Sequence, residues 1–249
     1  MRIAAQTKFS DVIDAINALL YKGEYANRND FAMRAILREC NRVRDAEPSL
    51  GWSLLGCYHS LLGEAEEVDR CFRASQDLGS IPVACDNYHT NLTNLGYFSR
   101  AHEFFRTRGH PEGGMFTRMA SVAFTSGSIQ TFSSFYEKAV AMNIEMPTLP
   151  VAKAIRASAV LSAAGVTDED ITRHLDAAGV VLRRHRIFFE DEGEVEVADE
   201  PGLFNGVTCI FRLHRSAEEV FDLNMELALA EEEMAIEKSP AFDVLFLSV

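Results

Sequence analysis

The segment Trp52-Ser-Leu-Leu55-Gly56 opens a helical hairpin, and Leu62-Gly63 with Val68-x-x-x-Phe72 closes it. Thirty-three residues later, Leu95-Gly96 with Ala101-x-x-x-Phe105 repeats the closing half. A fixed offset that keeps a glycine, a small or β-branched residue and an aromatic residue is typical of helix–turn–helix repeats. Such repeats bury their apolar faces only by stacking on one another. The stretch from Ser49 to Gly109 therefore predicts stacked helix pairs that form a scaffold with a groove.

This pattern resembles the tetratricopeptide repeat, whose signature is Trp-x-x-Leu-Gly-x-x-Tyr, then Ala-x-x-x-Phe, then a proline, over about 34 residues. The sequence departs from this signature at four positions. His59 and Val68 replace the tyrosine and alanine in the first copy, and Cys85 and His89 replace the tryptophan and leucine in the second. The resemblance implies an α-solenoid whose first helices line a concave face. The matching residues are Trp52, Leu55, Gly56, Phe72, Gly96, Ala101 and Phe105, with Pro48 and Pro82 at the two copy boundaries.

The same organisation extends over residues 1–186. Apolar residues recur at helical spacing, and glycines at positions 23, 63, 96, 127 and 165 punctuate about five degenerate hairpins. Thr167-Asp-Glu-Asp170 reads as a capping box that starts a helix running to about Arg184. The predicted fold class is mainly α, an α-solenoid of about five degenerate hairpins with a small C-terminal α/β element.

Residues 187–249 have a different period and predict a separate small domain in the order β-β-β-α-β. Ile187–Phe189 and Val195–Val197 read as a hairpin, and Val207–Leu213 alternates like a strand with one buried face. Ser216-Ala-Glu-Glu219 is a second capping box, which starts a helix reaching Met234. Phe242–Val249 reads as the final strand.

Net charge, the length of apolar runs and the spacing of the cysteines limit which partners and which cellular location we expect. The chain of 249 residues has a net charge of −13, which argues against nucleic acid or an anionic membrane as its main partner and fits a basic one. No run of about 18 apolar residues occurs, so we expect no membrane span. The five cysteines form no C-x-x-C pair and no metal-ligand array, which predicts reduced thiols and no metal site. The N-terminal segment has no uninterrupted apolar core, so we expect a cytoplasmic location. No motif for another cofactor occurs, and none is expected.

Two sets of residues are candidate binding sites. The segment 190–200 contains seven acidic residues and no basic one, and it either forms a solvated sheet edge or docks a basic partner. In the tetratricopeptide frame, the inner face is small, neutral or acidic and suits an extended or helical peptide. The lysines with which members of that family grip a carboxylate terminus are absent. The candidate residues are Ser53, Asp86, Thr90, Asn94, Thr117 and Ser121 on the inner face, together with Glu192, Glu194 and Glu196 in the acidic segment.

No local signature of nucleophilic, metal or nucleotide chemistry is found in the sequence, so we predict a protein that is not an enzyme. The leading hypothesis is a non-catalytic adaptor or chaperone-like protein that binds a protein segment in the concave groove. One alternative is an acidic antitoxin or immunity-type protein that neutralises a basic partner. A second alternative is a ligand-sensing regulator or enzyme with a site between the solenoid and the C-terminal sheet, where Arg184, Arg186, Arg212 and His214 would converge.

Overall fold

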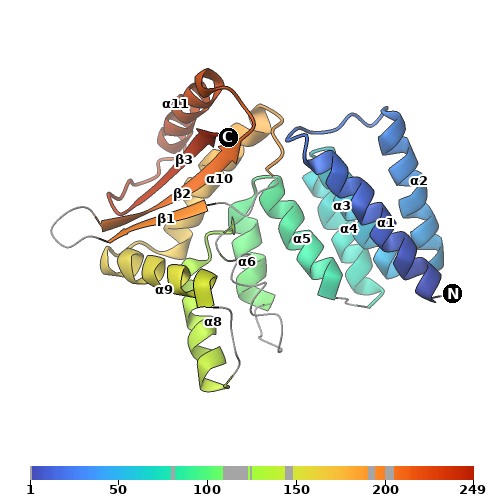
Figure 1. The fold of residues 1–249 in the computed structure, drawn as a ribbon, viewed down its shortest axis with the longest axis horizontal. Helices are drawn as coiled ribbons and strands as arrows, with labels where there is room; N and C mark the ends of the chain where they lie inside the picture. The colour runs from blue at the N-terminus through green and yellow to red at the C-terminus, as the bar shows by residue number, and fades with distance from the viewer. Residues whose placement is uncertain are drawn as a thin grey trace. The chain divides into compact units, whose positions relative to one another are not determined.

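The computed structural model describes residues 2–79, 82–108, 123, 125–143, 148–189, 194–199 and 205–249. In these ranges the chain is mainly helical with a small three-stranded sheet near its C-terminus, which confirms the coarse prediction (Figure 1). The helices are α1 (Arg2–Leu20), α2 (Phe31–Ala46), α3 (Pro48–Leu61), α4 (Ala65–Asp77), α5 (Pro82–Asn94), α6 (Phe98–Arg108), α8 (Ile129–Ala141), α9 (Thr148–Ala163), α10 (Asp168–Arg184) and α11 (Ala217–Glu233). The strands are β1 (Glu194–Asp199), β2 (Asn205–Leu213) and β3 (Phe242–Ser248).

The chain packs as two compact units. The first comprises Met1–Leu95 with Leu182–Glu190, and the second comprises Gly96–Val181 with Asp191–Val249. This division follows packing, whereas the predicted boundary between residues 186 and 187 follows a change of secondary structure and stays a prediction.

Helix α3 forms the centre of the first unit. It contacts α1, α2, α4 and α5, and ten of its 14 residues are buried. Its sequence explains this position, because a helix that is apolar or small on all sides is stable only when neighbours surround it. The surrounding core is built from Val12, Ile16, Met33, Ile36, Cys40, Val43, Leu54, Leu55, Cys57, Tyr58, Leu61, Leu62 and Cys71.

Glycines with positive φ mark the turns between helices, and all five glycines predicted to punctuate the hairpins are among them. Gly63, with φ of 79°, ends α3, and the amide of Glu64 donates to the carbonyl of His59 across the turn. A Cβ atom at position 63 would lie only 2.4 Å from the ring of Tyr25. That ring is held in turn by an edge contact with Phe188.

Gly63→Ala is expected to lower the free energy of unfolding by about 2 kcal/mol or more. About 1 kcal/mol or more arises from placing a side chain in the left-handed region, and the rest from displacing Tyr25. Gly23→Ala is the matched control, since Gly23 has φ of 63° and nothing within 4 Å of the added Cβ. Urea denaturation followed by circular dichroism measures both variants. Equal losses would contradict the proposed contact with Tyr25.

The sheet belongs to the second unit. β1 pairs antiparallel with β2, and β3 pairs parallel with β2, so α11 is the crossover between two parallel strands. One face carries Phe211, Phe242 and Phe246. The ring of Phe211 contacts Phe98 of α6 at a centroid distance of 5.6 Å, and Phe242 contacts His174 of α10 at 5.4 Å. This aromatic face is therefore covered by helices of the same unit.

The predicted hairpin between Ile187–Phe189 and Val195–Val197 is wrong. β1 pairs with β2, whereas Ile187 forms a single antiparallel bridge with Glu24. The amide of Phe188 donates to Gly23, and Ile187, Phe188 and Phe189 are all buried. Three consecutive buried side chains do not suit a hairpin with one solvated face, so this segment packs within the first unit instead.

Both predicted capping boxes are confirmed. Thr167 and Asp170 exchange backbone and side-chain hydrogen bonds at the start of α10, and Ser216 and Glu219 do the same at the start of α11. α10 also supplies carboxylates to other helices. Asp168 accepts hydrogen bonds of 2.8 Å from the amides of Gln130 and Thr131 at the start of α8. Asp176 accepts from the amides of Phe98 and Ser99 at the start of α6.

Candidate functional site

Of the predicted inner-face residues, Ser53 of α3 contacts α5, through residues of α5 that were not predicted to line this face. The side-chain amide of Asn87 donates to the hydroxyl of Ser53 at 3.0 Å, and the amide of Asn91 lies 3.8 Å from the sulfur of Cys57. Each pair is separated by 34 residues in the sequence. Ser53 is only 5% exposed. Its hydroxyl is therefore used to align two helices.

Asn94 has a similar role at the end of α5. It is 6% exposed, and its side-chain amide, oriented to satisfy both of its polar groups, donates to the carbonyl of Phe189 at 2.9 Å. The amide of Phe189 donates back to the carbonyl of Asn94. Asp86 is half-buried and Thr90 is exposed, whereas Thr117 and Ser121 lie outside the described residues. Of the four described candidates on this face, Ser53 and Asn94 are buried, whereas Asp86 and Thr90 are at least partly exposed to solvent.

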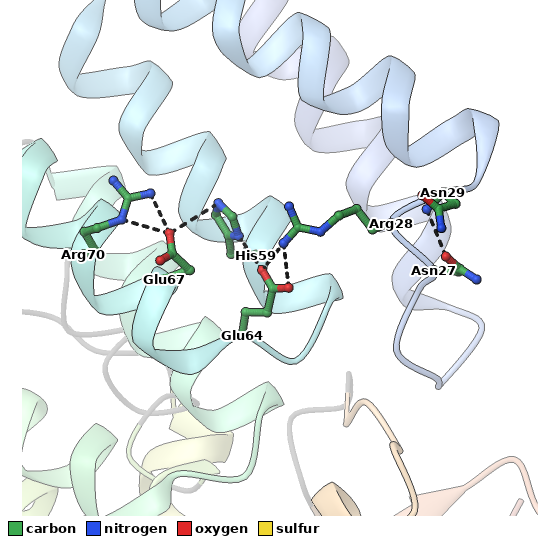
Figure 2. A network of polar contacts seen from close by, with 7 residues as sticks. All are labelled: Asn27, Arg28, Asn29, His59, Glu64, Glu67 and Arg70. Atoms are coloured by element: carbon green, nitrogen blue, oxygen red, sulfur yellow. Dashed lines mark hydrogen bonds and ion pairs between the residues drawn. The ribbon is translucent and has the colours of Figure 1, made fainter.

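A network of charged side chains lies at the α3–α4 turn (Figure 2). Arg28 reaches from the α1–α2 loop and donates from one nitrogen to both oxygens of Glu64, at 2.6 and 2.7 Å. His59 Nδ1 lies 2.8 Å from the same carboxylate, and His59 Nε2 lies 4.0 Å from Glu67. Glu67 also pairs with Arg70. Of these residues, sequence reasoning noticed only His59, because no short motif links a loop to a turn 36 residues away.

This network is built to hold the loop against the turn. Burial acts to raise the pKa of Glu64, but the hydrogen bonds from Arg28 and His59 outweigh it, so the pKa lies below its ordinary value. Glu64 therefore stays ionised and keeps both partners. The half-exposed Arg28–Glu64 pair is screened by solvent and contributes modestly to stability.

The cysteines are all free thiols, and four of the five are buried. Burial raises the pKa of Cys40, Cys71 and Cys209 to about 12, and that of Cys57 to about 11. Because the thiolate is the reactive form, these four side chains behave as small apolar groups at neutral pH.

The acidic candidates separate into two groups. Glu194 and Glu196 lie on one face of β1, as predicted for alternate residues of a strand, whereas Glu192 lies outside the described residues. Glu194 pairs with Arg212 of β2 at 2.7 Å. Glu196 is exposed and lies opposite Thr208. Of these two described carboxylates, Glu194 thus has its charge balanced by a basic residue of the neighbouring strand.

The negative charge of the chain is concentrated near its C-terminus. Residues 191–249 contain 15 of the 37 acidic residues but only three of the 24 basic ones, so this part carries almost the whole net charge of −13. Two of the four basic residues predicted to converge on a ligand make contacts elsewhere. Arg212 binds Glu194, and the guanidinium of Arg186 lies 5.3 Å from the centroid of the Tyr25 ring.

Comparison with known proteins finds no matching family model, no matching curated protein and no matching solved structure. No described helix combines the length and the apolar character that crossing a membrane requires.

Proposed function

We propose that this chain is a non-catalytic protein-binding protein, of the adaptor, chaperone-like or immunity type, whose partner presents a basic segment. The observation that carries this proposal is the separation of charge along the chain. Fifteen acidic and three basic residues in the last 59 positions give the C-terminal part a strong negative field. Such a field attracts a basic partner and speeds its encounter, while like-charged proteins are repelled.

The acidic end is favoured over the predicted groove as the contact surface. Ser53 and Asn94 use their polar groups within the first unit, and the sulfur of Cys57 faces Asn91. Residues that are committed to packing cannot also provide the hydrogen bonds that an extended peptide requires. Glu196, by contrast, is exposed on the sheet.

The helical part is proposed to be a degenerate repeat scaffold of the tetratricopeptide type. The 34-residue separation of Ser53 from Asn87 and of Cys57 from Asn91 supports this proposal, because equivalent positions of successive repeats face each other in a stack. In this proposal the helical scaffold has a structural role, and the acidic C-terminal part makes the contact with the partner.

Binding to a lysine-rich peptide without apolar residues tests the proposed function. We expect fluorescence anisotropy to show binding at about 20 mM salt that weakens by at least tenfold at about 200 mM, and no binding of the glutamate counterpart. Glu194→Gln with Glu196→Gln should weaken binding by about three- to tenfold. The control pair, Glu66→Gln with Asp77→Asn, removes two exposed charges from α4 and should have little effect. Failure of the intact chain to distinguish the two peptides would overturn the proposal.

A further inference from the structure

Helix α11 has two apolar faces. Its inner face buries Val220, Leu223, Leu227 and Ala230. Its outer stripe, defined as Phe221, Met225 and Leu229, is exposed to 63%, 54% and 56%. A surface helix ordinarily has one apolar face and a polar one opposite it. An apolar stripe that remains exposed, with buried residues on the other side, is typical of a helix that binds a partner.

The geometry of the outer stripe fits a helix better than a strand. Its members are four residues apart, so they follow one side of α11, roughly opposite the buried residues, over about 12 Å. Helices pack by inserting such rows of side chains between the rows of a neighbour. Met225, at the centre, is flexible enough to adapt to the side chains it meets.

The surroundings of the outer stripe are acidic. α11 contains seven acidic residues and no basic residue. On a helical projection, Glu218 and Glu232 lie at the two ends of the stripe, and Asp222 lies along one side. All three are exposed. A partner that covers the stripe must therefore bring positive charge to its edges.

We propose that the outer stripe of α11 binds a single basic amphipathic helix of a partner protein, with apolar residues on the stripe and lysines or arginines beside Glu218, Asp222 and Glu232. This inference rests on the proposed function and names the surface and partner class within it. A second copy of the chain is disfavoured as the occupant. Two α11 helices side by side would bring fourteen acidic residues together with no basic residue from either helix.

The probe is an 18-residue helical peptide of leucine and lysine with all leucines on one face. The comparison peptide has the same composition in an order that scatters the leucines around the helix. Anisotropy titrations of both use the full chain and a triple variant, Phe221→Ser, Met225→Ser and Leu229→Ser. The control variant is Leu78→Ser, which removes an apolar side chain of similar exposure from the first unit.

We expect the amphipathic peptide to bind the intact chain at least tenfold more tightly than the scrambled one. The triple variant should lose this preference, and Leu78→Ser should keep it. Replacing Glu218, Asp222 and Glu232 by their amides should weaken binding and flatten its salt dependence. Equal affinity for both peptides, or a preference that survives in the triple variant, would overturn the inference while leaving the proposed function intact. If the intact chain binds none of the basic peptides, the proposed function itself is overturned. Circular dichroism of each variant verifies that it is folded.

Discussion

Replacing Glu231 by alanine is expected to lower the free energy of unfolding by about 3–5 kcal/mol, the largest effect among the variants considered. Glu231 is 4% exposed and accepts from His174, which is 3% exposed, at 2.7 Å. Its second oxygen lies 2.8 Å from Lys238. Removing the carboxylate leaves a buried imidazole without its hydrogen-bond partner, and a buried polar group left unpaired costs free energy.

The neighbouring residue is the matched control. Glu232 lies on the same helix and is exposed, so Glu232→Ala should change the free energy of unfolding by less than about 0.5 kcal/mol. Chemical denaturation followed by far-ultraviolet circular dichroism compares the two. A similar small loss in both variants would show that the His174–Glu231 contact does not hold α10 to α11.

The carboxylate of Glu231 also makes the stability of the protein depend on pH. Burial acts to raise the pKa of Glu231, but the hydrogen bonds from His174 and Lys238 outweigh it and leave the pKa below its ordinary value. The unfolded chain therefore binds a proton at a higher pH than the folded one, so stability is lost as the pH falls below about 4.5. Glu231→Gln should lose less stability than the wild type over this acid range. The measurement is the free energy of unfolding as a function of pH for both proteins. Equal losses of stability in acid would show that Glu231 is not the group responsible.

Asp168→Ala is expected to lower the free energy of unfolding by about 2–3 kcal/mol. Asp168 is 4% exposed, and its two oxygens accept from the amides of Gln130 and Thr131. These amides lie in the first turn of α8 and have no hydrogen-bond partner within that helix. The positive end of the α8 dipole also favours the carboxylate at this position. Without Asp168 the start of α8 keeps unpaired donors in a partly buried place.

Two further variants distinguish the loss of the hydrogen bonds between Asp168 and α8 from the loss of a negative charge. Asp168→Asn keeps one acceptor and should cost less than Asp168→Ala. Glu169→Ala removes an exposed acidic residue from the same first turn of α10, and its effect should be a few tenths of a kcal/mol. Thermal and urea denaturation provide the comparison. If Glu169→Ala costs as much as Asp168→Ala, the contact with α8 is not the source of the effect.

Local features were predictable from the sequence. The turn glycines have the positive φ that the hairpin pattern requires, and the capping boxes at Thr167 and Ser216 form as their spacing predicts. β2 and β3 occupy the predicted positions, and alternate residues of β2 do share a buried face. These features depend on a few adjacent residues, whose backbone preferences act wherever the segment is placed.

The candidate site was predictable only in part. Placing Glu194 and Glu196 on one face of a strand needs only the two-residue period, and this prediction is confirmed. The roles of Ser53 and Asn94 were not visible, because their partners Asn87 and Phe189 come from other elements. The outer stripe of α11 was also missed, since Phe221, Met225 and Leu229 look in the sequence like ordinary core residues.

The sequence by itself determined the turn glycines, the starts of α10 and α11, the positions of β2 and β3, and where the negative charge lies. Only the tertiary structure decided which strand β1 pairs with, that Ile187–Phe189 packs beside Gly23, and that Glu231 is buried against His174. The reason is physical. Local conformation is set by short-range sterics and hydrogen bonds, whereas partners distant in the chain are selected by the burial and polar pairing of the whole unit, which must outweigh the entropy of closing the intervening chain.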